Sequence, residues 1–352
     1  MWNLRRLAIV VCLGITVALV SVIVLLTLST PHEQDVRQQL QQIAKPHAFD
    51  FVSWELYALS CLPKEMLCKG GETGREAKLC SQIRTVLVDK SIATFPPITF
   101  RLEKPPHLLV VSPRDRILYF DRRVLRQELS VEEMETLEAQ VDELGLSSLV
   151  VELGGFGATY PPIVGDHLKL TNTINAAVEE WLHQYLAFRP LGFLYLLDSV
   201  GIRRSPEVVT MNETLAGIVS EEIGSEVYAR YYDGQEEVKA ERNAPELEFD
   251  FDAEMRQTRK IVDGYLSQGK IEEAEGYMKE RRREFVAHGY QIRKLNQAYF
   301  AFHGIYGHDP ASVGPIYSDL EQLRSESPSL GHFLDKAAAM SSYAELNEAL
   351  DK

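Results

Sequence analysis

The chain has 352 residues, of which 45% are hydrophobic and 25% charged, the balance of an ordinary globular protein. This composition excludes a wholly disordered, collagen-like or disulfide-scaffold chain, and the length suggests about two domains. Because 37 Lys and Arg stand against 51 Asp and Glu, the formal net charge is −14, and we expect no nucleic-acid binding.

The first predicted element is a membrane-spanning helix. Residues 7–29 contain no charged side chain, and a helix of this length reaches roughly 34 Å, enough to cross the hydrocarbon core. The alternative, a secretory signal peptide, has a shorter apolar region and a better cleavage site. Arg5 and Arg6 precede the run and acidic sequence follows it. The positive-inside rule therefore predicts a single-pass cell-membrane anchor at 1–32, with a cytoplasmic N-terminus and an extracytoplasmic main domain.

Three cysteines, Cys61, Cys68 and Cys80, then lie outside the membrane, where a disulfide can persist. Their spacings of 7 and 12 residues do not match the patterns of zinc ribbons or fingers. We expect one local disulfide and one remaining thiol, with the pairing left open.

Residues 33–95 are predicted to form a stalk or helical region, because Val36, Leu40 and Ile43 follow a helical spacing. Residues 96–172 are predicted to form a small mixed-sheet subdomain. Strands are expected at 98–102, 107–112, 116–120 and 149–153. Within this region Ser130 and Glu133 make a capping box, which predicts the start of a helix.

The remaining residues, 173–352, are predicted to be mainly helical, which makes the fold class α+β. Helices are expected at 176–188, at 213–232, at three places between 250 and 305 that Gly269 and Gly289 separate, and at 330–350. Residues 233–254 contain nine acidic and two basic residues and are predicted to form an acidic surface loop.

The helix at 176–188 carries the residues best suited to chemistry. Glu179 and His183 lie about 40° apart around the helix axis, at the edge of its apolar face, and Glu180 is turned about 100° from Glu179. In zinc peptidases with an H-E-x-x-H helix, the first and fifth positions bind the metal and the second is the general base. This chain reads Glu179-Glu180-Trp181-Leu182-His183, with glutamate in place of the first histidine.

Each of these residues also has an ordinary structural interpretation. Glu179 and His183 can form a simple i,i+4 contact worth about 0.3 kcal/mol. Further along, Asn212 and Glu213 open the next predicted helix, where the first is suited to an N-cap and the second to the first turn. Trp181 is expected to lie in the core.

The spacing of these motifs resembles the gluzincin class of zinc metallopeptidases, in which a glutamate of a later helix is the third metal ligand. More narrowly, Glu180-Trp181-Leu182-His183, Phe188-Arg189-Pro190-Leu191-Gly192, Asn212-Glu213-Thr214 and Leu295-Asn296-Gln297-Ala298-Tyr299-Phe300 resemble a group of membrane-anchored bacterial proteins described as predicted aminopeptidases. The likeness runs from about residue 105 to residue 340, and its specific part lies between 179 and 216.

The resemblance implies a zincin-like helical subdomain at 173–352 that acts on peptide or protein substrates. It implies Glu180 as the base that deprotonates the attacking water, His183 and Glu213 as zinc ligands, and Glu179 as a substitute ligand. The segment 154–162 matches the edge strand that pairs with an extended substrate, and its glycines allow a close approach. The donor to the transition-state oxyanion is expected among Tyr299, His303 and Tyr306.

The glutamate at position 179 changes the electrostatics of such a site. A zinc ion held by Glu179, His183 and Glu213 has a formal charge of zero instead of +1, so it activates water less, and the added oxygen favours harder ions such as Mn²⁺. Without a metal, the carboxyl groups of Glu179, Glu180 and Glu213 crowd together unless some take up protons.

Three functions remain open on the sequence. The first is an active metallopeptidase with an unusual ligand set. The second is a pseudoenzyme on a gluzincin-like fold that has lost metal or activity and binds peptides or partners. The third is a helical interaction module, in which the acidic residues are solvated and the helices between 250 and 305 form the binding face.

Overall fold

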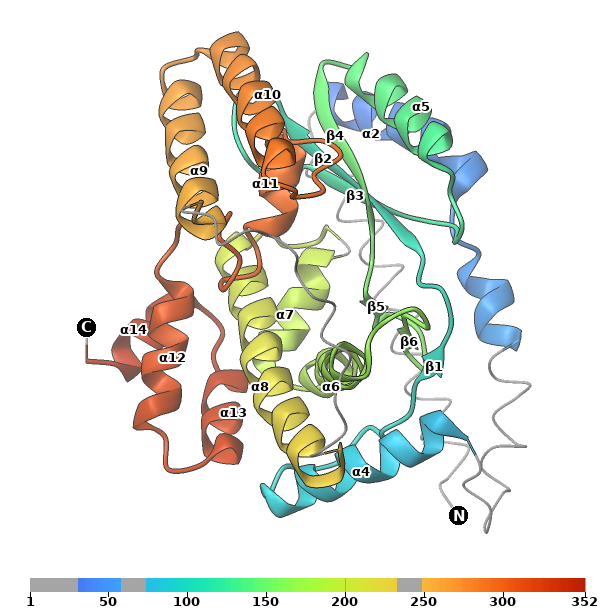
Figure 1. The fold of residues 1–352 in the computed structure, drawn as a ribbon, viewed down its shortest axis with the longest axis vertical. Coiled ribbons are helices and arrows are strands. Elements are labelled where there is room, and N and C mark those ends of the chain that lie inside the picture. Colours follow the sequence, from blue (N-terminus) through green and yellow to red (C-terminus); the bar gives the residue numbers. More distant parts are fainter. Residues whose placement is uncertain (1–30, 58–73, 200, 233–248, 352) are drawn as a thin grey trace.

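A computed structural model describes residues 31–57, 74–199, 201–232 and 249–351 (Figure 1). It confirms a mixed α+β fold, with many helices around two small sheets. No helix among the described residues is long and apolar enough to cross a membrane, and the predicted span at 7–29 lies outside them. Cys61 and Cys68 also lie outside the described residues, while Cys80 is half-buried, so the disulfide stays a prediction.

A three-stranded antiparallel sheet has β2 (His107–Pro113) at its centre, between β3 (Asp121–Leu125) and β4 (Leu146–Glu152). Successive residues of β2 face opposite cores, as the two-residue period of a strand requires. Leu109 and Val111 pack with α2 (Pro31–Ala44) and α5 (Val131–Asp142), whereas Leu108 and Val110 pack with α11 (Gln297–His303). Helices therefore cover both faces of the sheet (Figure 1).

The strand predicted at 116–120 is wrong, because the third strand of this sheet is β3, at 121–125. The apolar residues Ile117 and Tyr119 pack against the core between the sheet and α11, but they are not part of a strand. Residues 121–125 read Asp-Arg-Arg-Val-Leu. Because an edge strand tolerates charged side chains, this segment lacks the apolar pattern from which a strand is predicted.

A second sheet consists of very short strands in the order β1-β6-β5. β1 (Arg101–Leu102) runs parallel to β6 (Ile163–Val164), and β5 (Gly155–Phe156) pairs with β6 in antiparallel fashion. Only the last two residues of the strand predicted at 98–102 are in β1. β5 lies at the edge of this sheet.

The largest core surrounds two long helices, α6 (Leu170–Leu186) and α8 (Pro206–Tyr232), which pack side by side (Figure 1). Trp181 is fully buried there and donates its Nε1–H to Pro96 O at 2.8 Å, which confirms its expected place in the core. The helices around this pair are α4 (Arg75–Asp89), α7 (Pro190–Ser199), α12 (Ile316–Glu326), α13 (Leu330–Ala338) and α14 (Tyr343–Ala349).

Most predicted helices are present, with corrections at their ends. The capping box of Ser130 and Glu133 is formed at the start of α5. α9 (Phe251–Ser267) and α10 (Ile271–Ala287) are each followed by a glycine with positive φ, Gly269 and Gly289, as expected.

Several predicted boundaries are wrong. α6 spans Leu170–Leu186 rather than 176–188, and β4 spans Leu146–Glu152 rather than 149–153. α9 begins inside the predicted acidic loop, because Asp250 caps it by accepting the N–H of Ala253. Residues 233–248 of that loop lie outside the described residues. The single helix expected at 330–350 is two helices, because α13 ends at Ala338 and Ser342 is the N-cap of a new helix, α14. α8 begins at Pro206 rather than at 213, since proline suits the first helical position.

Candidate metal site

The three residues expected to bind a metal lie together. Glu179 and His183 of α6 and Glu213 of α8 each offer a ligand atom, and these atoms all lie within 4.8 Å of one another. His183 Nε2 is 3.4 Å from Glu213 Oε2. The packing of α6 against α8 therefore joins motifs thirty residues apart in the sequence into one group that can hold a metal ion.

The site is half-shielded from water by the way the two helices pack. Glu179 and His183 flank the buried stripe of α6, so their side chains are half-buried. Glu213 is only 5% exposed and lies well inside α8. The interpretation of Glu213 as a first-turn acid and of Asn212 as an N-cap is wrong, because both residues lie about two turns after Pro206.

Asn212 has a different role, as a partner of the imidazole. Its fully buried side chain places Oδ1 3.0 Å from His183 Nδ1. An amide oxygen only accepts, so Nδ1 carries a proton, and in the neutral ring Nε2 presents its lone pair toward Glu213. Metal-binding histidines characteristically donate their other ring N–H to a neighbouring acceptor. The donor set and the tautomer of His183 thus fit a metal cation.

The charges in the site oppose one another. Burial raises the pKa of Glu179 to about 7 and that of Glu180 to about 8. Burial alone lowers the pKa of His183, but Glu213, Glu180 and Glu179 outweigh it and raise the value to about 10. Burial raises the pKa of Glu213, yet the charge and hydrogen bond of His183 and the hydrogen bond of Tyr195 bring it below its usual value. Without a cation, a protonated His183 and protonated glutamic acids relieve the crowding expected from the sequence.

Glu180 faces the glycine-rich edge strand. A Cβ on Gly155 would lie 2.3 Å from Glu180 Oε1, and one on Gly157 would lie 2.7 Å from Oε2. The Gly157 N–H hydrogen-bonds to the carboxylate of Glu180. Gln184, one turn later on α6, holds the loop by donating to Gly157 O at 3.1 Å and to Thr159 O at 2.7 Å. The expected close approach is confirmed, and the group that approaches these glycines is the carboxylate of Glu180.

Tyr195 of α7 belongs to the site, although no motif spacing points to it. Its hydroxyl donates to Glu213 Oε1 at 2.8 Å, and its ring stacks on His183 with the centroids 5.6 Å apart. Burial and the nearby Glu213 raise the pKa of Tyr195 well above its usual value, so it stays a donor. α7 begins at Pro190, separated from the end of α6 by residues 187–189, and this short connection returns the chain toward α6 and places Tyr195 beside His183.

Of the three expected oxyanion donors, Tyr306 is the one beside the carboxylates. Burial and the charges of Glu213 and Glu179 raise the pKa of Tyr306 well above its usual value. The next residue, Gly307, donates its N–H to Thr214 Oγ1 at 3.1 Å, which ties this loop to α8 beside Glu213.

The other two candidates, His303 and Tyr299, interact with each other instead. His303 Nδ1 lies 2.9 Å from Asp309 Oδ2, and the ring of Tyr299 lies 4.1 Å from that of His303. Burial and Asp309 raise the pKa of Tyr299. These contacts give His303 and Tyr299 partners of their own.

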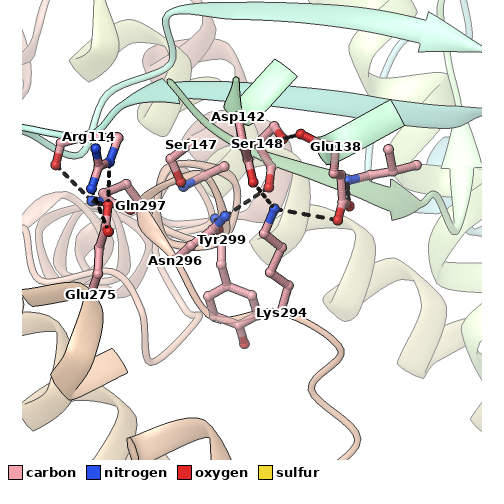
Figure 2. A network of polar contacts seen from close by, with 12 residues as sticks. Arg114, Glu138, Asp142, Ser147, Ser148, Glu275, Lys294, Asn296, Gln297 and Tyr299 are labelled. Carbon is pink, nitrogen blue, oxygen red and sulfur yellow. Dashed lines mark hydrogen bonds and ion pairs between the residues drawn. The ribbon is translucent and has the colours of Figure 1, made fainter. Parts of the chain in front are cut away.

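The motif that begins at Leu295 anchors α11 to the large sheet (Figure 2). Asn296 accepts the N–H of Tyr299 at the start of α11 and donates to Ser148 O of β4. Figure 2 shows the ring of Tyr299 extending away from this network. Further contacts are Gln297 to Arg114 O, Arg114 to Glu275, Lys294 to Asp142, and Arg293 to the buried Glu138. The segment 295–300 therefore has a structural role, since it connects α11 to the large sheet.

The chain matches no protein-family model, no curated protein and no solved structure.

Proposed function

We propose that the protein is a metal-dependent hydrolase that cleaves peptide bonds. The observation that supports this most directly is the convergence of Glu179, His183 and Glu213, with the tautomer of His183 set by Asn212. One nitrogen and two carboxylate ligands leave a coordination position open, as in catalytic zinc sites. Zn²⁺ is the proposed ion, and Mn²⁺ is the alternative because the ligands are rich in oxygen.

The metal, when bound, supplies Lewis-acid activation of water and of the scissile carbonyl. Glu180 is the proposed base, which takes a proton from the attacking water and passes it to the leaving amine. Burial raises the pKa of Glu180 to about 8 without a metal, and a bound cation would lower it, so that the carboxylate could accept a proton near neutral pH. Tyr306 is the proposed donor to the oxyanion, because the hydroxyl of Tyr195 is already directed to Glu213.

The edge strand β5 is the proposed place for the substrate backbone. It lies at the border of its sheet and directly beside Glu180, so an extended peptide that pairs with it passes the proposed base. The apolar run at 7–29 supports anchoring in the cell membrane, with this site on the extracytoplasmic side.

Metal analysis of the purified full chain tests the proposal. We expect about one equivalent of Zn or Mn, lost in His183→Ala and Glu213→Ala but kept in Glu207→Gln, a control that alters an exposed glutamate of the same helix. Glu180→Gln should abolish peptide hydrolysis and keep the metal. Absence of metal under metal-replete conditions refutes the hydrolase, and unchanged turnover in Glu180→Gln refutes the role of Glu180.

A catalytically degenerate peptide-binding protein is the second candidate. The observation that favours it is that His183 and Glu213 can satisfy each other without a metal, at 3.4 Å, while Glu179 stands where a histidine is expected. The Glu179→His variant tests it. Metal binding or hydrolysis gained by this one substitution, and absent before it, supports loss of function at position 179; a metal-binding and active unaltered chain refutes it.

A further inference from the structure

Arg122 is a cation beside the proposed active site that none of the steps above uses. In the antiparallel ladder it lies opposite Val110, and residues opposite each other share a face of the sheet. Val110 and Val124 both pack on the side of α11. Arg122 therefore points to the face of the sheet that α11 covers, whereas its neighbour Arg123 points to the opposite face.

The guanidinium of Arg122 lies 5.8 Å from the ring centroid of Tyr119, and one of its nitrogens has no hydrogen-bond partner among the described residues. This nitrogen, Nη2, is shielded from solvent. The Nε of Arg123 also lacks a hydrogen-bond partner there, but Arg123 forms an ion pair with Asp121 at 2.9 Å, and no ion pair is found for Arg122 within the described part of the chain. A buried cationic donor without a partner is costly, and a structure that keeps one commonly does so for a ligand.

The acids nearest to Arg122 already have other partners. Its positive charge helps lower the pKa of Glu213, so the two groups are close. Glu213, however, is directed to His183 and Tyr195. Asp198, whose charge also acts on Arg122, accepts the N–H of Ser205 at 2.7 Å. The Nη2 of Arg122 is therefore available to an anion that binds beside the candidate ligands.

We propose that Arg122 binds a carboxylate of the substrate peptide. This rests on the proposed peptidase function and adds a substrate class to it, namely peptides with a free carboxylate close to the scissile bond. The planar fork of a guanidinium matches a carboxylate with two parallel hydrogen bonds. The carboxylate comes either from the C-terminus or from an Asp or Glu side chain, and the two sources are separable by experiment.

Binding of peptide pairs to the full chain carrying Glu180→Gln tests this, since binding is then measured without turnover. The first pair differs only in a free or amidated C-terminus, and the second differs only in Glu against Gln beside the central bond. We expect the carboxylate member of one pair to bind roughly ten-fold or more tightly than its neutral counterpart. This preference should vanish in Arg122→Gln, weaken in Arg122→Lys, and persist in the matched control Arg123→Gln.

A preference in the first pair assigns the C-terminal carboxylate, and one in the second pair assigns a side chain. Equal binding within both pairs overturns the proposal, as does a preference that survives in Arg122→Gln or failure of all four peptides to bind. Arg122→Lys keeps the charge, so it provides the result if Arg122→Gln does not fold. Metal content and hydrolysis by the unaltered chain are scored separately, so a failed carboxylate preference is distinguishable from a failed hydrolase.

Discussion

Loading the site with zinc at pH 7 should release protons, because imidazole and carboxyl ligands must be deprotonated to bind. With a pKa of about 10, His183 holds about one proton at pH 7, and Glu179, with a pKa of about 7, holds about half of one. Glu213, whose pKa is lowered, adds none. A Glu180→Gln background removes the protons of the base. It also removes one of the carboxylates that raise the pKa of His183, but Glu213, which raises it most, remains, so about one and a half protons should leave per zinc bound.

Calorimetric titration of the full chain with zinc measures this number when it is repeated in buffers of different ionisation enthalpy. The slope of the observed binding heat against the ionisation enthalpy of the buffer gives the number of protons released. Glu179→Gln in the same background is the matched control and should release about half a proton less. Because His183 must lose its proton, zinc affinity should rise roughly ten-fold per pH unit between pH 7 and pH 9. A slope near zero would refute the reasoning, since it means that His183 is neutral before zinc arrives.

Three other substitutions probe the surroundings of the site. Asn212→Leu removes the acceptor of the imidazole N–H and should weaken metal binding about 10- to 100-fold, measured by competition with a chelator. Gly155→Ala places a Cβ 2.3 Å from Glu180 Oε1, so the carboxylate must move; we expect at least about ten-fold slower hydrolysis with metal content unchanged, and equal rates would contradict the placement. Arg293→Met leaves Glu138, which is 3% exposed, without its two-bond partner and should lower the free energy of unfolding by about 2 kcal/mol in urea titrations; a loss below about 0.5 kcal/mol would show that Lys294 suffices.

The group of candidate ligands was predictable from the sequence by combining helical periodicity with the resemblance between motifs. Helical periodicity alone places Glu179 beside His183, and this part needs no tertiary information. Bringing Glu213 to them requires α6 and α8 to pack side by side, which the resemblance supplied and the structure confirms.

The remaining members of the site could not be found by spacing. Tyr195 reaches Glu213 because α7 restarts at Pro190, and the orientation of that restart depends on tertiary packing. The interpretation of Asn212 as a cap is wrong because α8 begins about two turns earlier, at Pro206. Arg122 was missed because a polar edge strand has no apolar alternation to mark it.

The candidate ligands and the proposed substrate contact belong to different packed units. α6 and α8, which carry the three ligands, share one hydrophobic core, whereas β3, with Arg122, belongs to the cores on either side of the large sheet. A loosening of the sheet should therefore broaden the range of peptides accepted before it weakens the hold on the ion. Under the proposed function, such a division would let the range of accepted peptides change without a change in metal binding.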